Sequence, residues 1–222
     1  MRNLYISVLF LIASVHVSAD SILIKNDRVR NADVREAAIW FNGGIDNRTV
    51  TWLLSSLDDI RGQFSNINNV DIYINSEGGD MDAGYLAWEV LRKSPVTLNM
   101  INASMTGSAA TLLYCASGER YTMPHARFLL HPAAAWNDKD DYLKPDQARR
   151  ILEDAEDYNS LFRTVYSSCT TLTDEELRKI TSSETGRVVP GTDAAEKLGL
   201  VSRGVREPHS YPVNYYITDS GN

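Results

Sequence analysis

The most informative stretch of this sequence is Ile72-Tyr73-Ile74-Asn75-Ser76-Glu77-Gly78-Gly79-Asp80. Its first half continues an apolar run that starts at Val70 and is interrupted only by Asp71, which is typical of a buried strand. The consecutive glycines that follow allow a tight turn and a close backbone approach. Helical spacing then runs from Met81 to Arg92, so we expect a strand, a loop and a helix in succession. The side chains of this helix expected in the core are Tyr85, Trp88, Val90 and Leu91.

Strands and helices alternate through most of the remaining chain. This order predicts an α/β fold with a largely parallel sheet and crossover helices. No internal repeat, low-complexity stretch or linker interrupts it, so residues 20–222 are expected to form a single domain. The other predicted strands are 37–41, 96–103, 121–123 and 127–131, and the other predicted helices are 47–65, 108–116, 145–167, one that Thr173 caps, and 194–198.

The charge balance excludes some partners. The chain has 222 residues, 22 of them basic and 29 acidic, and a formal net charge of −7. A nucleic-acid partner needs a basic surface that neutralises phosphates, so we expect none. Docking on an anionic membrane surface is disfavoured for the same reason.

The N-terminus has the pattern of a signal peptide. Arg2 precedes the apolar run Leu4–Val15, and Val17-Ser18-Ala19 supplies small side chains for a cleavage site. We therefore expect residues 1–19 to be removed after Ala19 and the mature chain to be exported, to the periplasm or outside the cell, and free of the membrane. The alternative is an uncleaved anchor, although the run is shorter than the roughly 20 apolar residues that span a bilayer.

Both cysteines, Cys115 and Cys169, remain after this cleavage. In an oxidising compartment they can form a disulfide, but the sequence leaves this pairing and two separate buried thiols both open. The histidines are scattered and have no metal-ligand spacing, so we expect no metal and no cofactor.

A second loop, Met105-Thr106-Gly107-Ser108-Ala109-Ala110, places a hydroxyl at the start of a predicted helix. Backbone N–H groups at helix starts favour a negatively charged oxygen, so the two loops together can form an oxyanion hole beside a nucleophilic serine. A serine at this position is also a common N-cap. A nucleophilic serine needs a base, and His131, at the end of Phe128-Leu129-Leu130, is the candidate.

In combination these segments resemble the proteolytic subunit of Clp protease. The family's Ile-Asn-Ser-Pro-Gly-Gly is matched at 74–79, with a glutamate in place of proline, and its Ala-Ser-Met-Gly-Ala at 107–110. Its Leu-Pro-x-x-Arg-x-x-x-His is matched at 123–131, and its closing Ala-x-x-x-Gly-Leu-Val at 195–201. The resemblance extends from about Trp40 to Val201.

The resemblance implies a serine peptidase that works through an acyl-enzyme. Ser108 would be the nucleophile and His131 the general base, with the N–H groups of Gly79 and Ala109 holding the oxyanion. Ser104 also follows an alanine and precedes a methionine, as in the family motif. It falls too close to Gly79 for the family spacing, so it is the reserve nucleophile.

The third catalytic residue departs from the family pattern. The family's aspartate lies about a dozen residues before the closing Gly-Leu-Val, and counting back from Gly199 reaches Arg187 or Gly186. The nearest acids are Glu184 upstream and Asp193 downstream. Three readings are open: Glu184 orients the histidine, the site is a Ser–His dyad, or the enzyme is weak.

Three other functions are kept as alternatives. A signal-peptide-peptidase type of enzyme would use a Ser–Lys dyad, with Lys139 or Lys144 as the base. A crotonase-like acyl-thioester enzyme would use a related oxyanion hole. A catalytically inactive member would serve as an assembly subunit, which the missing aspartate motivates.

The resemblance also implies an assembly. The expected fold is ClpP/crotonase-like, with repeated ββα units and a protruding long helix at about 145–167 through which two homo-oligomeric rings stack. Family members usually act with an ATP-driven unfoldase. An exported protein would lack that partner, so we expect ATP-independent cleavage of peptides or unfolded segments.

Overall fold

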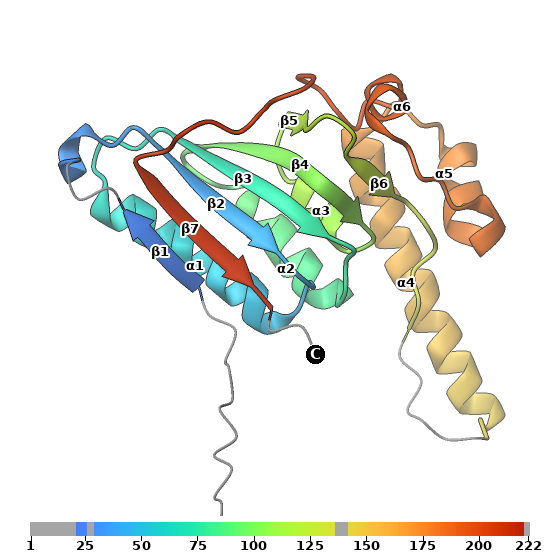
Figure 1. Cartoon of the computed structure of the whole chain (residues 1–222). Coiled ribbons are helices and arrows are strands. Elements are labelled where there is room, and N and C mark those ends of the chain that lie inside the picture. Colours follow the sequence, from blue (N-terminus) through green and yellow to red (C-terminus); the bar gives the residue numbers. More distant parts are fainter. Residues whose placement is uncertain (1–20, 26–28, 136–141, 220–222) are drawn as a thin grey trace, which may run out of the picture.

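The computed structural model describes residues 21–25, 29–135 and 142–219 (Figure 1). Within them lies a seven-stranded sheet in the order β1-β7-β2-β3-β4-β5, with β6 paired to β4 off this path. The β1–β7 pair is antiparallel and the other pairs are parallel, which confirms the predicted α/β class. The strands are β1 Ser21–Lys25, β2 Glu36–Asn42, β3 Asn69–Ser76, β4 Thr97–Gly107, β5 Glu119–Thr122, β6 Arg127–Leu129 and β7 Val213–Thr218.

The helices form two groups. In Figure 1, α1, α2 and α3 lie behind the sheet, whereas α4 projects beyond the β6 side, with α5 and α6 near its C-terminal end. The long helix predicted over about 145–167 is α4. The α-helices are α1 Asn47–Gln63, α2 Met81–Leu91, α3 Ala110–Tyr114, α4 Pro145–Cys169, α5 Asp174–Ser182 and α6 Thr192–Lys197, and the 3-10 helices are η1 Asn31–Asp33 and η2 Glu184–Gly186.

The central strands are buried because helices cover them on one side and the chain's own C-terminal segment packs on the other. Ile39, Ile72 and Met100 lie opposite one another on β2, β3 and β4 and are fully buried. On the other face, Tyr73 packs with Tyr211 and neighbouring aromatic side chains. Strands covered on both faces read as near-continuous apolar runs, which explains why they were found from the sequence.

Side-chain caps set the helix starts. Asp46 Oδ1 accepts the N–H of Thr49 at 2.7 Å to start α1, and Asp80 Oδ1 accepts the N–H of Ala83 at 2.7 Å to start α2. Thr173 caps α5, as predicted. A cap satisfies N–H groups that the helix leaves unpaired, so these residues fix where each loop ends and its helix begins.

The predicted core face of α2 is wrong for Tyr85 and Val90, which are 42% and 43% exposed. Small residues face the core instead, because α2 packs closely on α3. A Cβ added at Gly84 would lie 3.1 Å from Leu112 Cδ1 and 3.3 Å from Ala109 Cβ. The buried side of α2 consists of Met81, Ala83, Gly84, Ala87 and Leu91.

The C-terminal segment belongs to the sheet, which the sequence did not predict. β7 lies between β1 and β2. Before it, Arg206 Nη2 lies 2.6 Å from Asp71 Oδ2, and the Tyr211 hydroxyl donates to the same carboxylate. Asn99 Nδ2 donates to Asp71 Oδ1 at 2.6 Å. Asp71 is 1% exposed, and these donors compensate the loss of its hydration.

Cys115 and Cys169 form a disulfide with their Cα atoms 5.6 Å apart. It joins the end of α3 to the end of α4, which settles in the structure the pairing that the sequence left open. Across the described residues, no helix is both long and apolar enough to cross a bilayer. The predicted signal peptide, residues 1–19, lies outside the described residues.

Candidate active site

Ser108 occupies a sharp turn between β4 and α3. Its φ is +50°, a left-handed conformation that side chains other than glycine, asparagine and aspartate rarely adopt. Its N–H donates to the carbonyl of Leu129 at 3.0 Å, and α3 starts two residues later, at Ala110. Ser108 therefore precedes the helix that was predicted to start with it. A strained turn between a strand and a helix is known to expose a serine hydroxyl at the end of a sheet.

The Gly78–Gly79 loop packs directly against this turn. A Cβ at Gly78 would lie 2.5 Å from the Cβ of Ser108 and 3.0 Å from the nitrogen of Ala109, so only glycine permits the contact. The Gly78 carbonyl accepts the N–H of Ile45 at 2.8 Å, and the N–H of Asp80 donates to the Ile45 carbonyl at 2.8 Å. These bonds on either side of Gly79 do not use its own N–H. The proposed oxyanion donors, Gly79 and Ala109, thus come from adjacent loops.

His131 follows β6 at the same edge of the sheet. Gly107 of β4 pairs with Leu129 of β6 in parallel register, so the chain leaves both strands in the same direction, toward Ser108 and toward His131. The His131 side chain is 22% exposed. The pairing therefore puts the predicted nucleophile and the predicted base on neighbouring strand ends.

Glu184 is the acid that approaches the histidine. Its Oε1 lies 3.6 Å from His131 Nδ1, longer than a hydrogen bond, and its side chain is 69% exposed. η2 reaches this position because Leu130 and Val188 exchange two backbone hydrogen bonds, of 3.0 and 2.9 Å. A carboxylate facing Nδ1 favours the tautomer that leaves Nε2 free to act as a base.

Gly186 is a residue of the site that sequence reasoning missed. A Cβ there would lie 1.9 Å from the Lys179 carbonyl oxygen, so a larger residue cannot occupy the position without moving η2 off α5. The glycine thereby sets where Glu184 lies. Its sequence signal was a glycine two residues after the nearest acid, which by itself suggests only a turn.

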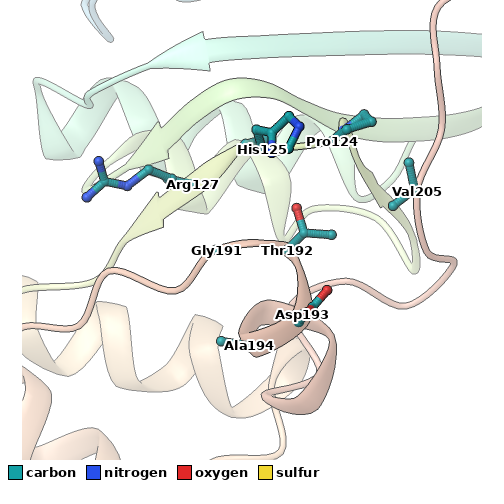
Figure 2. Close-up of a pocket in the computed structure, with 9 residues that line it drawn as sticks. Pro124, His125, Arg127, Gly191, Thr192, Asp193, Ala194 and Val205 are labelled. Carbon is teal, nitrogen blue, oxygen red and sulfur yellow. The ribbon is translucent and has the colours of Figure 1, made fainter.

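The other candidates, Asp193 and Ser104, each line a hollow of the surface. Asp193 lines a cavity of about 650 Å³ with His125 and Arg127 (Figure 2). Ser104 lies in a bulge of β4 and lines a second hollow of about 480 Å³, which Glu77 and Gly78 of the glycine loop also line.

The remaining candidates are the two lysines of the Ser–Lys alternative and any group of side chains that could hold a metal ion. Lys144 is the residue directly before α4, at the end that projects away from the sheet in Figure 1, and Lys139 lies outside the described residues. In the described ranges, no group of three or more His, Cys, Asp or Glu side chains is arranged to hold a metal ion.

Comparison with known families matches most of the chain. The family described as Clp protease matches residues 25–207. The chain belongs to the Clp protease family. The match contains both glycine loops, Ser108, His131 and Glu184.

Curated relatives are distant. The chain is 30% identical to the ATP-dependent Clp protease proteolytic subunit 2 of Borreliella burgdorferi over 145 residues, which cover 59% of this chain and 63% of that protein. It is 37% identical to the proteolytic subunit 1 of Chlamydia muridarum over 60 residues, which cover 26% of this chain and 31% of that protein. The chain thus spans less than two thirds of the length of these relatives.

Among solved structures, a mutant of ClpP1 from Listeria monocytogenes is similar, with a TM-score of 0.60 and 18% identity. The superposition covers 78% of this chain and 92% of that one. At this identity the likeness shows the fold, and it confirms the expected ClpP-like architecture.

Proposed function

We propose that the chain is a serine endopeptidase with Ser108 as nucleophile. The observation that carries the proposal is the strained turn at Ser108, which lies against Gly78 and hydrogen-bonds β6 two residues before His131. The family membership supports a peptidase, and the local geometry supports the serine type.

In this mechanism, Ser108 Oγ attacks the peptide carbonyl while His131 Nε2 takes its proton. The N–H groups of Gly79 and Ala109 stabilise the oxyanion, and His131 returns the proton to the leaving amine. Water then attacks the acyl-enzyme while His131 takes a proton from it, and His131 returns this proton to Ser108 Oγ as the acyl group is released. Glu184 stabilises the imidazolium from the Nδ1 side, and its distance and exposure make this contribution smaller than that of a buried aspartate.

A serine-directed fluorophosphonate probe tests the assignment on the mature chain. We expect labelling of the wild type, loss of labelling in Ser108→Ala and normal labelling in Ser104→Ala. Labelling that survives Ser108→Ala would place the nucleophile elsewhere. If the wild type is not labelled while a control peptidase is, the chain is the inactive assembly subunit, a reading that the exposed, distant Glu184 favours.

Export after cleavage near Ala19 is part of the same proposal. The N-terminal pattern and the Cys115–Cys169 disulfide support it, because disulfides persist in oxidising compartments. An exported chain has no ATP supply, so hydrolysis of short peptides or unfolded segments is expected to proceed equally with and without ATP. Cell fractionation tests the location, and recovery of the full-length chain in the cytosol would remove the basis for ATP independence.

A further inference from the structure

The carbonyl of Ser108 is held more firmly than a turn requires. It accepts the N–H of Thr111 at 2.9 Å and the hydroxyl of the same threonine at 2.6 Å. A carbonyl oxygen has two lone pairs, and both are used here. The Thr111 side chain is fully buried, so water does not compete for these bonds.

Tyr166 extends this contact to α4. Its hydroxyl oxygen lies 2.8 Å from Thr111 Oγ1. Because the only hydroxyl hydrogen of Thr111 points to Ser108, the tyrosine must be the donor. Burial raises the pKa of Tyr166 well above its usual range, so the phenol keeps the proton that it donates. A chain of hydrogen bonds therefore runs from the long helix to the nucleophile's backbone.

These hydrogen bonds matter because they hold the peptide unit between Ser108 and Ala109. The Ser108 carbonyl and the Ala109 N–H belong to one planar amide and point in opposite directions. Fixing the direction of the carbonyl therefore fixes the direction of the Ala109 N–H, a proposed oxyanion donor. The same bonds hold the backbone at Ser108 in its strained conformation.

The disulfide holds the same two helices together. Cys115 directly follows α3, about one turn after Thr111, and Cys169 ends α4, about one turn after Tyr166. The two helices are thus joined side by side by a covalent bond and by the tyrosine–threonine contact. Changing the tyrosine hydroxyl alone leaves the covalent link in place, so the helices stay packed in such a variant.

We infer that Thr111 and Tyr166 are positioning residues that aim the Ala109 N–H at the oxyanion. The inference rests on the proposed roles of Ser108 and Ala109. It makes the long helix part of the catalytic apparatus through one hydroxyl, besides any role in assembly.

Kinetics of single substitutions test it. Tyr166→Phe and Thr111→Val should each lower kcat for a peptide ester about tenfold, since losing an oxyanion donor outright costs about a hundredfold or more. KM should stay within twofold of the wild type, because the ground-state carbonyl makes a weaker contact with the donor. Thr111→Ser keeps the hydroxyl and should retain most of the activity.

Tyr114→Phe is the matched control. Tyr114 is as fully buried as Tyr166 and lies on α3, but its hydroxyl donates to the Tyr121 carbonyl at 2.9 Å and not toward Ser108. Its kcat should stay within about twofold of the wild type. Equal losses of kcat in Tyr166→Phe and Tyr114→Phe would show a general packing effect and overturn the inference, as would an unchanged kcat in Tyr166→Phe.

Amide hydrogen exchange tests the inference without requiring the enzyme to be active. Tyr166→Phe should speed exchange in a peptide covering residues 107–112, whereas Tyr114→Phe should leave that peptide like the wild type. If the wild type fails to react with the fluorophosphonate probe, the proposed function fails while this exchange comparison still decides whether the hydrogen-bond chain holds the turn. Unchanged exchange at 107–112 in Tyr166→Phe would sink the inference even in an active enzyme.

Discussion

Glu184 is a weaker partner for the histidine than a buried aspartate, because it is exposed and lies 3.6 Å from His131 Nδ1. Replacing the aspartate of a Ser-His-Asp protease with asparagine lowers kcat about 10⁴-fold. Water and salt screen an exposed carboxylate, so we expect Glu184→Gln to lower kcat only about tenfold to a hundredfold. Steady-state hydrolysis of a peptide ester measures it.

Asp193→Asn is the control for this change, since Asp193 is the other acid that the sequence offered and it lies in the cavity of Figure 2. Its kcat should match the wild type. A loss in Asp193→Asn together with normal activity in Glu184→Gln would reverse the assignment, and normal activity in both would favour a Ser–His dyad.

Gly186 allows a second test of the same acid without touching its charge. A Cβ at this position would meet the Lys179 carbonyl oxygen at 1.9 Å, so Gly186→Ala must move η2 and carry Glu184 away from His131. We expect kcat to fall about as far as in Glu184→Gln, by about tenfold or more, and not further when both changes are combined. Gly191→Ala, where a Cβ meets nothing within 4 Å, should leave kcat unchanged. Additive losses in the double variant would mean that Gly186 acts elsewhere.

Residues with local signals were predictable and residues joined by long-range contacts were not. The glycines and Ser108 lie in short loops directly after strands, where spacing along the chain indicates their role. Glu184 was identifiable only as the nearest acid, because its approach depends on the pairing of Leu130 with Val188. The contact of Thr111 with Tyr166 joins residues that are far apart in sequence, and no local pattern marks it.

Among the elements, the segment before β7 is held to the sheet through one buried carboxylate. Arg206→Ala removes the cation beside Asp71 and leaves a nearly buried charge with only the Asn99 and Tyr211 donors. Breaking a buried pair from one side costs about 3 kcal/mol in the free energy of unfolding. Urea denaturation should show this loss.

Arg203→Ala is the control for the charge itself. Arg203 pairs with Glu119 at 2.7 Å on the surface, where its side chain is half exposed. An exposed pair contributes less than about 1 kcal/mol, so the urea midpoint should barely move. Similar losses from Arg203→Ala and Arg206→Ala would show that Asp71 is not the anchor of this segment.

The disulfide between the ends of α3 and α4 makes a contribution to stability that can be measured. The disulfide closes a loop with a sequence separation of 54. Removing it by Cys115→Ala with Cys169→Ala should lower the free energy of unfolding by about 2–4 kcal/mol. A dithiol reductant should bring the wild type to the midpoint of the double variant and leave that variant unchanged. Equal midpoints for the oxidised wild type and the double variant would contradict this.

Element types were easier to predict than their faces and partners. Apolar runs and caps identified β3, α1 and α5, since both signals are local. The buried face of α2 was mispredicted because the close approach of α3 at Gly84 selects small residues over Tyr85. β7 was missed because its place between β1 and β2 depends on partners from the other end of the chain.

At the scale of the whole molecule, α4 extends well beyond its buried part. Its buried residues, Phe162, Val165, Tyr166 and Cys169, all lie in its C-terminal half, whereas Leu152 in the projecting half is 58% exposed. Within the part of the chain that the structure describes, the N-terminal half of α4 has no buried residue, so its exposed apolar side chains are expected to be buried when copies associate. The family resemblance implies stacked rings joined through this helix.

We therefore expect the mature chain to be an oligomer in size-exclusion chromatography with light scattering, and Leu152→Glu to shift it toward smaller species, because a carboxylate in an apolar contact between copies is costly to bury. The control Gln63→Glu adds the same charge at the exposed end of α1 and should leave the mass of the oligomer unchanged. A wild-type monomer would exclude the ring assembly. An unchanged oligomer in Leu152→Glu would instead place the contact between copies on another surface, and the projecting half of α4 would then need a different partner.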